Sequence, residues 1–303
     1  MTHDILVVGG GPAGLTAALY AARAGKTVAV LERAVPGGQI VYSPLVENYP
    51  ALPGVSGADF AAALAGQTEA LGVEIITAEA VSAVRTEGGF RLETDEGAMD
   101  CRTLILATGV QHRALGLPGE AELVGAGISY CAVCDGAFYA GRDVAVVGGG
   151  DTAVQDALFL ANLCRRVTLL VRRDRLRASD TAKAETLRQR DNVELRFSTT
   201  VEALCSADGA LTGVTVRERG ETAALAIDGL FLAVGQEPSG SAFAALAPVD
   251  AQGYFAAGEN CIAAPGVFVA GDCRAKTVRQ LATAVGDGAC AALSACACLE
   301  RNG

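Results

Sequence analysis

The sequence contains only two histidines, His3 and His112, and no tryptophan. Zinc sites commonly use histidine beside cysteine, and hydrolytic triads use a histidine base. With so little histidine, we expect no catalytic triad of this kind, and we predict no metal site.

Positive charge is also scarce, because 24 Lys and Arg residues stand against 34 Asp and Glu residues and the net charge is −10. Nucleic-acid binding needs clustered basic side chains that neutralise phosphates. Anionic membrane surfaces attract basic segments for the same reason. The charge balance therefore predicts no nucleic-acid partner and no membrane partner.

Secretory and membrane-spanning signals are weak. No basic region precedes the short apolar run Ile5–Val8, as it would in a signal peptide. The most membrane-like stretch is Leu281–Leu299, but Gly286, Asp287 and Gly288 interrupt it, and a buried Asp is costly in lipid. We expect this stretch to be a core helix of a soluble protein.

The ten cysteines do not follow the pattern of a secreted disulfide scaffold, which concentrates them in a short chain. Eight of them are scattered singly or lie in the C-terminal helical stretch. This distribution favours a reducing compartment, and we expect a cytoplasmic protein.

The length of 303 residues suggests about two domains, and 51% apolar residues suffice for their cores. Two segments read as a strand, a helix and a strand: the first has elements at 4–8, 12–24 and 27–31, and the second at 143–147, 151–162 and 167–171. We predict an α/β fold with two βαβ nucleotide-binding units. Further strands or alternating segments are expected near 80–94, 103–107, 211–217, 221–234 and 267–270, and further helices at 58–71 and 277–299.

A glycine-rich fingerprint follows the first strand of the first unit. Its G-x-G-x-x-G positions are Gly9, Gly11 and Gly14, with Pro12 and Ala13 at the start of the helix. In such a motif the first glycine allows a tight turn, the second lets backbone approach a pyrophosphate, and the third packs helix on strand. The helix N-terminus offers N–H groups to the anion.

A second fingerprint, of the form G-x-G-x-x-A, lies at the same place in the second unit. It contains Gly148, Gly150, Asp151, Thr152 and Ala153. We count all five as candidate cofactor-binding residues. For Asp151, capping of the following helix is the interpretation that we favour.

The residue that ends each second strand distinguishes the two units. Glu32, followed by the further candidate Arg33, stands in the first unit, where a carboxylate binds a free ribose 2′-OH. Arg172, Arg173 and Arg177 stand in the second, where guanidinium groups accommodate a 2′-phosphate. The first unit therefore suits FAD or NAD, and the second suits NADP; a solvated basic face is the other interpretation of the arginines.

Gly271 and Asp272 follow the strand expected near 267–270. A carboxylate at this place can hold a polyhydroxy chain such as the ribityl of FAD, and by position alone it can equally cap the next helix.

Cys131 and Cys134 form the only C-x-x-C motif in the chain, and Asp135 follows them. Residues three apart share a helix face, which allows a disulfide. A cysteine at a helix start also has a lowered thiol pKa. Asp135 is placed to exchange a proton with a leaving thiolate. A redox pair is the interpretation that we favour over a packed core or a metal site.

Taken together, these motifs give the chain a strong resemblance to the low-molecular-weight thioredoxin reductases of bacteria, over nearly its full length. The resemblance includes the two fingerprints, the cysteine motif, the arginines, and Gly271 and Asp272. It adds these candidate cofactor-binding residues: Gly38, Gln39, Asn48, Ala107, Thr108, Gly109, Arg279 and Gln280.

The resemblance implies two Rossmann-like, three-layer ββα domains, with an NADPH domain at 113–242 inserted into a split FAD domain at 1–112 and 243–303. It also implies a homodimer. Electrons would pass from NADPH through FAD to the Cys131–Cys134 disulfide and then to thioredoxin. By resemblance, Cys134 faces the flavin, Cys131 attacks the partner, and Asp135 is the acid–base.

Other functions stay open at this point. The chain can be a reductase of another disulfide substrate, or a ferredoxin-linked relative, although the intact second fingerprint and Arg172–Arg177 disfavour loss of the nicotinamide. A flavin-bound redox sensor that uses Cys131 and Cys134 as a switch is the non-enzymatic alternative.

Overall fold

The structure is a computed structural model that describes residues 2–52 and 54–301. It divides into two compact units: residues 1–111 and 237–303 form the one that we call the outer unit, and residues 112–236, inserted between these two segments of the sequence, form the inner unit. The chain passes between them in two short strands that pair with each other, β7 (Val110–His112) and β16 (Gln236–Pro238). Residues 237–242, which we expected in the inserted part, thus group with the outer unit.

Within the described residues of the outer unit, eight strands form one sheet with a central order of β17-β18-β6-β1-β2-β3. The pairs β18–β6, β6–β1, β1–β2 and β2–β3 are parallel. The strands are β1 (Thr2–Val8), β2 (Val28–Glu32), β3 (Glu74–Thr77), β4 (Ala80–Thr86), β5 (Gly89–Thr94), β6 (Gly97–Leu106), β17 (Ile262–Ala264) and β18 (Val267–Val269).

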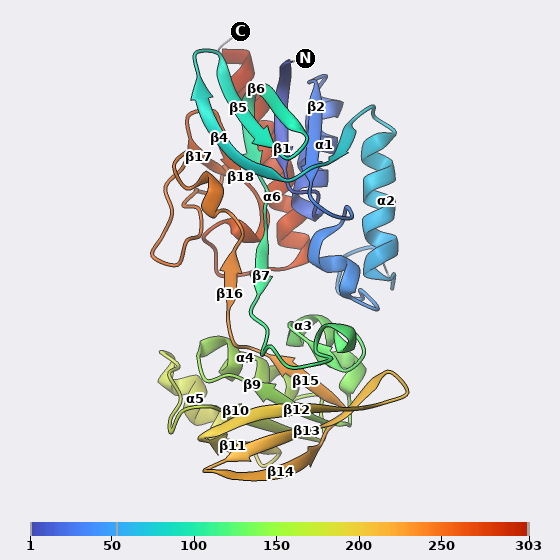
Figure 1. Ribbon diagram of the computed structural model, residues 1–303, viewed down its shortest axis with the longest axis vertical. Helices are drawn as coiled ribbons and strands as arrows, with labels where there is room; N and C mark the ends of the chain where they lie inside the picture. Colours follow the sequence, from blue (N-terminus) through green and yellow to red (C-terminus); the bar gives the residue numbers. More distant parts are fainter. Residues whose placement is uncertain (1, 53, 302–303) are drawn as a thin grey trace. The chain divides into compact units, whose positions relative to one another are not determined.

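Both faces of this sheet are covered, which explains its near-continuous apolar strands. Ile5 and Val7 of β1 pack with one core, which α1 (Pro12–Arg23) and α6 (Leu281–Arg301) complete. Leu6 and Val8 face the other core, beneath β4, β5 and residues 243–255. The remaining helices are α2 (Gly57–Glu69), η1 (Gly38–Tyr42), η4 (Ser241–Phe243) and η5 (Gly271–Cys273), and Figure 1 shows α6 beside α1.

The inner unit repeats this plan. Its parallel sheet has the order β11-β10-β9-β15-β8, and an antiparallel sheet, β12-β13-β14, covers one face while helices cover the other. The strands are β8 (Ile128–Ser129), β9 (Asp143–Val147), β10 (Arg166–Val171), β11 (Val193–Phe197), β12 (Thr199–Ala207), β13 (Ala210–Glu218), β14 (Glu221–Ala226) and β15 (Gly229–Leu232). The helices are η2 (Ala121–Leu123), α3 (Ala132–Asp135), η3 (Gly136–Tyr139), α4 (Asp151–Leu160) and α5 (Thr181–Arg188). The predicted α/β class and the three-layer, Rossmann-like units are confirmed.

One helix boundary differs from the prediction. The helix expected from residue 277 begins at Leu281, because residues 274–280 form a loop held by side chains. In that loop Lys276 binds Asp287, and the Arg279 guanidinium donates to the carbonyl oxygen of Asp272.

The membrane-like stretch is the helix α6, and among the described residues it is the one helix whose length and composition would suit a membrane span. Its Ala291, Ala292 and Ala295 are fully buried, and its Asp287 forms ion pairs. Gly286 and Gly288 do not break it. We interpret α6 as a core helix.

Gly288 generates a prediction about α1–α6 packing, because a Cβ at this position would collide with the carbonyl oxygen of Ala13. The substitution Gly288→Ala forces the helices apart, so we expect a loss of about 1–3 kcal/mol and a fall of several degrees in melting temperature. The matched control is Gly286→Ala on the same helix. A Cβ there meets nothing within 4 Å, and Ala is favoured over Gly in a helix, so the melting temperature should hold or rise. Equal melting temperatures for the two variants would contradict this contact.

Candidate functional site

The first fingerprint forms a tight connection between β1 and α1. Gly9 has φ +106°, and a Cβ there would collide with the carbonyl oxygen of Ala107; a Cβ on Gly14 would collide with the carbonyl oxygen of Gly9. Gly11 is the N-cap residue of α1, and its Cβ position is open, with the nearest atoms 4.0 Å away. The N-terminus of α1 is therefore unobstructed at Gly11.

Glu32 lies against this fingerprint. At the end of β2, its carboxylate accepts a hydrogen bond from the Gly10 N–H (2.7 Å) and one from the Ala34 N–H (3.0 Å). The Gly37 N–H donates to the Gly10 carbonyl (2.8 Å), which brings Gly38 and the exposed Gln39 to the same loop. A Cβ on Gly38 would lie 3.3 Å from the Gly11 Cα.

Three motifs meet at one edge of the sheet. β1, β6 and β18 are parallel neighbours, so Gly9, Ala107 and Gly271 all follow the carboxyl ends of adjacent strands. The carboxyl edge of a parallel sheet is where such folds bind their ligands. Next to Ala107, Thr108 has a buried hydroxyl without a hydrogen-bond partner among the described residues, and Gly109 has φ +67°.

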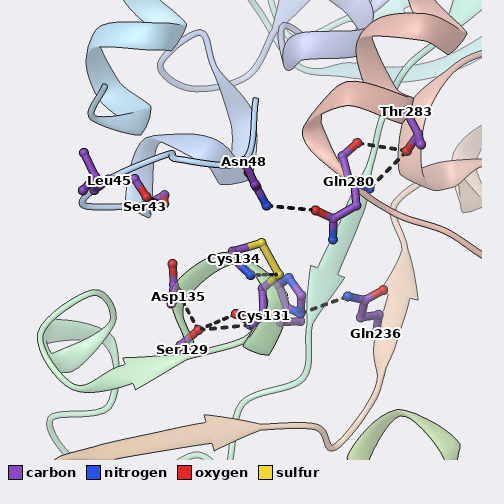
Figure 2. Close-up of a disulfide and its surroundings, with 11 residues drawn as sticks. Ser43, Leu45, Asn48, Ser129, Cys131, Cys134, Asp135, Gln236, Gln280 and Thr283 are labelled. Atoms are coloured by element: carbon purple, nitrogen blue, oxygen red, sulfur yellow. Dashed lines mark hydrogen bonds between the residues drawn. A yellow bond between two sulfur atoms is a disulfide. The ribbon is translucent and has the colours of Figure 1, made fainter. Parts of the chain in front are cut away.

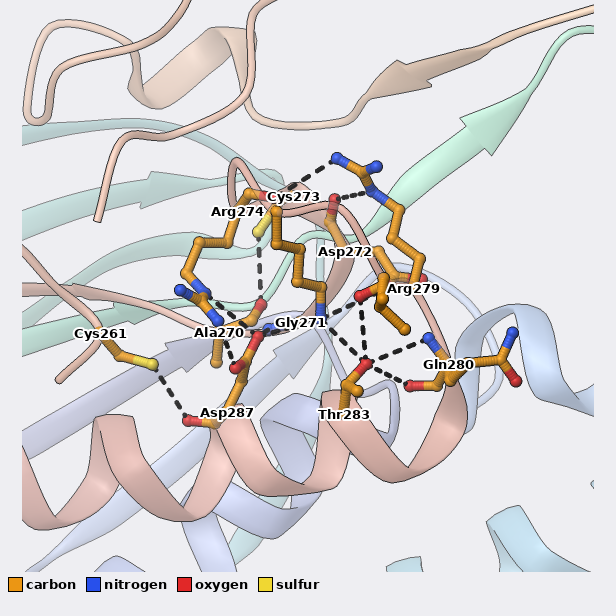
Figure 3. Close-up of polar contacts among 12 residues, drawn as sticks. Cys261, Ala270, Gly271, Asp272, Cys273, Arg274, Arg279, Gln280, Thr283 and Asp287 are labelled. Atoms are coloured by element: carbon orange, nitrogen blue, oxygen red, sulfur yellow. Dashed lines mark hydrogen bonds and ion pairs between the residues drawn. The ribbon is translucent and has the colours of Figure 1, made fainter. Parts of the chain in front are cut away.

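The turn at Gly271 and Asp272 is fixed by Asp287 of α6. The Asp287 carboxylate accepts from the Gly271 N–H (3.1 Å) and forms ion pairs with Arg274 (2.7 Å) and Lys276 (3.0 Å), as Figure 3 shows. These charged side chains are nearly buried, with exposed fractions of 9–15%. Sequence reasoning treated Asp287 only as a break in an apolar run.

Asp272 itself is incompletely satisfied. Its Oδ1 atom is buried without a hydrogen bond among the described residues, although Lys276 Nζ approaches it at 3.4 Å. Burial raises the pKa of the Asp272 carboxyl group, and Lys276 opposes that rise. A buried polar atom without a partner is costly, so this carboxylate fits a site for a ligand hydroxyl. It does not cap α6, which begins at Leu281.

The structure brings Asn48 and Gln280 together, although they lie far apart in the sequence: Asn48 Nδ2 donates to Gln280 Oε1 (3.4 Å). The Arg279 guanidinium donates to the carbonyl oxygen of Asp272 (3.2 Å) and lies over the ring of Tyr254. Arg33 instead lies on the surface, 4.0 Å from Glu79.

The second fingerprint has the same construction between β9 and α4. A Cβ on Gly148 would lie 2.5 Å from the Ala233 carbonyl oxygen and 2.8 Å from the Ala153 Cβ. Gly150, the N-cap residue of α4, has nothing within 4 Å of its Cβ position, and Thr152 is exposed.

The interpretation of Asp151 as a cap of α4 is wrong. α4 has no side-chain cap at its N-terminus. Asp151 accepts instead from the Ser179 N–H and hydroxyl (2.8 Å each) and from the Asp180 N–H (3.2 Å). These hydrogen bonds lower the pKa of Asp151 and fasten the loop that follows the arginines to the fingerprint.

Arg172, Arg173 and Arg177 are exposed, and their guanidinium groups bind no side chain or carbonyl of the described residues. Their backbone is nevertheless anchored, because the Arg177 N–H donates to the Gly149 carbonyl (2.6 Å). Three guanidinium groups held beside a fingerprint without acidic partners form a fitting site for a phosphate.

Cys131 and Cys134 form a disulfide, with Cα atoms 5.3 Å apart. Cys131 is the N-cap residue of the short helix α3, and its sulfur accepts from the Cys134 N–H (3.2 Å), as drawn in Figure 2. Both are partly exposed, and Val133 between them is exposed. Among the described residues, no group of His, Cys, Asp and Glu could hold a metal ion.

Asp135 is linked to the disulfide through Ser129, a residue that sequence reasoning missed because an isolated Ser carries no signal. The Ser129 hydroxyl donates to Asp135 Oδ2 (2.6 Å) and accepts from the Cys131 N–H (3.1 Å). Asp135 Oδ1 is buried without a described partner. Burial raises the pKa of Asp135, and the Ser129 hydrogen bond opposes that rise. The group is thus suited to hold a proton two hydrogen bonds away from the Cys131 backbone.

Residues 3–288 match the family model described as pyridine nucleotide-disulphide oxidoreductase. The chain is 38% identical over 296 residues to a thioredoxin reductase of Listeria innocua, covering 97% of this chain and 92% of that protein. It is 39% identical to NADPH-dependent thioredoxin reductase 3 of Arabidopsis thaliana, covering 99% of this chain and 59% of that longer protein. The crystal structure of a thioredoxin reductase from Streptococcus pyogenes has a TM-score of 0.93 at 36% identity, covering 99% of both chains.

The inner unit contains one more carboxyl group with a raised pKa, that of Asp156. Asp156 of α4 is partly buried and makes no hydrogen bond or ion pair with the described residues. Burial raises its pKa to about 7. Sequence reasoning missed Asp156, because only its packing environment distinguishes it from a surface acid.

This pKa predicts a pH-dependent stability. An unfolded Asp has a pKa of about 3.9, so between about pH 4 and pH 7 the folded chain retains the Asp156 proton while the unfolded chain loses it. The free energy of unfolding is therefore highest below about pH 4 and falls as the pH rises from about 4 to 7. The substitution Asp156→Asn should stabilise the protein by roughly 2–4 kcal/mol at pH 8 and by little at pH 4.5. Urea unfolding at the two pH values measures this, with the exposed Asp208→Asn as control. If Asp156→Asn raised the free energy of unfolding equally at pH 4.5 and pH 8, the buried Asp156 carboxylate would not be the cause.

Proposed function

The chain belongs to the pyridine nucleotide-disulphide oxidoreductase family, and from this membership we propose that it is a thioredoxin reductase. It passes electrons from NADPH through FAD and the Cys131–Cys134 disulfide to oxidised thioredoxin. The observation that carries the proposal is a preformed disulfide whose Cys131 N–H is joined through the Ser129 hydroxyl to the Asp135 carboxyl group, in a chain with two complete dinucleotide fingerprints.

The outer unit, residues 1–111 and 237–303, is the FAD domain in this proposal. The open N-terminus of α1 receives the pyrophosphate, and Glu32 binds the adenosine ribose. The unsatisfied Asp272 Oδ1 and Thr108 hydroxyl fit the ribityl chain and the flavin edge. Bound FAD supplies the two-electron chemistry that couples a hydride donor to a disulfide.

The inner unit, residues 112–236, is the NADPH domain in this proposal. Gly150 leaves the N-terminus of α4 free for the pyrophosphate, and Arg172, Arg173 and Arg177 bind the 2′-phosphate. Asp151 contributes by holding Ser179 and thereby the loop that follows the arginines.

The dithiol performs the exchange with thioredoxin. Reduction of the Cys131–Cys134 disulfide consumes two electrons and yields two thiols. Cys131 then attacks a sulfur of oxidised thioredoxin as a thiolate, and Cys134 resolves the mixed disulfide. Asp135, whose pKa is raised by burial, holds and returns the proton that the departing sulfur needs.

We further propose a cytoplasmic homodimer that binds neither nucleic acid nor membrane. In support, the other eight cysteines, all of them among the described residues, form no disulfide, as expected in a reducing compartment, and the net charge is −10.

The arginines predict a preference for NADPH over NADH. Each charge-assisted contact with the 2′-phosphate is worth roughly 1.5–3 kcal/mol, so the wild type should prefer NADPH on the order of 100-fold in kcat/KM. The double substitution Arg172→Ala/Arg173→Ala should remove most of this preference and leave kcat/KM for NADH nearly unchanged. Equal use of both nucleotides by the wild type would refute the phosphate clamp.

The two cysteines predict a division between the steps. In Cys134→Ser, NADPH should still bleach the flavin, whereas NADPH-dependent reduction of thioredoxin should be abolished, because no dithiol remains. Cys131→Ser should also lose turnover, and a long-wavelength absorbance band in this variant alone would assign Cys134 as the flavin-facing thiol. The control is Cys205→Ser, an exposed cysteine outside the pair, with normal turnover expected. If both single variants reduced thioredoxin normally, the proposed function would be wrong. If the wild type reduced other disulfides but not thioredoxin, the assignment of thioredoxin as the substrate would be wrong.

Asp135 predicts a proton-dependent second half of the reaction. Asp135→Asn keeps an acceptor for Ser129 but cannot carry the proton, so rapid mixing should show slower thiol–disulfide exchange by about 100-fold with little change in flavin reduction. Ser129→Ala removes the hydrogen bond that opposes the raised pKa and should slow exchange less. Slowing of the NADPH step alone would exclude Asp135 as the acid–base.

A further inference from the structure

Two cysteines outside the active-site motif lie close together in the outer unit. Cys261 precedes β17 and is completely buried, whereas Cys290 lies on α6 and is partly exposed. The Sγ atoms of both approach the same carbonyl oxygen, that of Glu259, at 4.0 Å for Cys261 and 2.9 Å for Cys290. The Cys290 thiol also contributes to the raised pKa of Cys261, so the two groups lie within electrostatic reach of each other.

The surrounding contacts keep the two segments in register. Cys261 Sγ donates to the carbonyl oxygen of Asp287 at 3.6 Å (Figure 3). Asp287 lies one helical turn before Cys290 on α6. Ser294, one turn after Cys290, donates to the carbonyl oxygen of Asn260 (2.7 Å). The loop that carries Cys261 is therefore fastened to the same face of α6 on both sides of the cysteine pair.

The backbone at Cys261 is strained. Its φ is +60°, a conformation that side-chain-bearing residues rarely adopt and that Cys enters at a cost. The Val269 N–H donates to the Cys261 carbonyl (2.9 Å), which ties the strained residue into the sheet beside β18. The fold thus holds the buried thiol at a fixed place against α6.

We propose that Cys261 and Cys290 are a second redox pair, a site that peroxide oxidises to an intramolecular disulfide fastening α6 to the sheet of the outer unit. The proposal does not depend on the function assigned to Cys131 and Cys134. A bound metal ion is not the favoured occupant, because no group of three or more ligating side chains lies among the described residues.

The reaction divides between the thiols by their exposure. The accessible Cys290 attacks one oxygen of hydrogen peroxide as a thiolate, the O–O bond breaks, and a sulfenic acid and one water form. Cys261 Sγ then attacks the Cys290 sulfur, the S–S bond forms, and the hydroxyl leaves with the Cys261 proton as a second water. Two electrons pass from the two thiols to the peroxide. Burial raises the pKa of Cys261 to about 12, which leaves the first attack to Cys290.

The site has a structural consequence. Asp287 of α6 holds the Gly271 turn and the cations Arg274 and Lys276, so the position of α6 determines the position of that turn. A covalent bond from Cys290 to Cys261 closes a loop of the chain and restrains the unfolded state, which raises the unfolding temperature.

The test uses the full-length holoprotein carrying Cys131→Ser/Cys134→Ser, so that the active-site pair cannot contribute. The reduced protein is treated with hydrogen peroxide, its remaining thiols are alkylated under denaturing conditions, and fragments are identified by mass spectrometry. We expect a Cys261–Cys290 cross-link and an unfolding temperature, followed by circular dichroism, that is roughly 5 °C higher than in the reduced form.

Matched variants separate the outcomes. Adding Cys290→Ala or Cys261→Gly, the latter chosen because glycine suits a φ of +60°, should abolish both the cross-link and the temperature shift. Cys298→Ala, on the same helix, should preserve both. In the Cys261→Gly variant, Cys290 should be trapped as a sulfenic acid by dimedone. Peroxide treatment that leaves both thiols unlinked, oxidises Cys290 only to higher acids, or gives a cross-link without a temperature shift would overturn the proposal.

Discussion

The buried carboxylate of Asp287 is the interaction on which the outer unit depends. It accepts from the Gly271 N–H and binds Arg274 and Lys276 in a nearly dry environment. Removing one partner from such a group leaves an uncompensated charge, which typically costs 3–5 kcal/mol. Asp287 therefore joins the helix that packs on α1 to the turn that presents Asp272, and the cofactor edge of the sheet inherits its geometry from a residue that itself contacts no cofactor in our proposal.

Much of the fold could be predicted from the sequence because its signals are local. Each fingerprint requires glycine where a neighbouring carbonyl oxygen or methyl group leaves no room for a Cβ, as Gly9 and Gly148 show. The apolar strands buried on both faces and the C-x-x-C motif are likewise recognisable from short stretches of sequence. The family resemblance rests on these same residues, and the comparisons confirm it.

The parts that could not be predicted depend on long-range contacts. The start of α6 is displaced to Leu281 by ion pairs and hydrogen bonds of the preceding loop, which no helix propensity encodes. Asp151 stands at a position typical of a helix cap, yet its carboxylate accepts a hydrogen bond from Ser179, which lies 28 residues further along the chain. Ser129 acquires its role only because β8 and α3 place its hydroxyl between Asp135 and the Cys131 N–H. The strands β11 and β12 and the helix α5, with weaker patterns, were not anticipated.

The exposed arginines after β10 have a consequence for encounter with an anionic coenzyme. The chain as a whole carries a net charge of −10 and would repel such a molecule from a distance. At physiological ionic strength, however, the Debye length is about 8 Å, so counterions quench the global repulsion before the coenzyme arrives. The attraction of Arg172, Arg173 and Arg177 operates within that length. At physiological salt the coenzyme therefore experiences mainly the attraction of these nearby arginines. In very dilute buffers the unscreened net negative charge should slow its association with the protein.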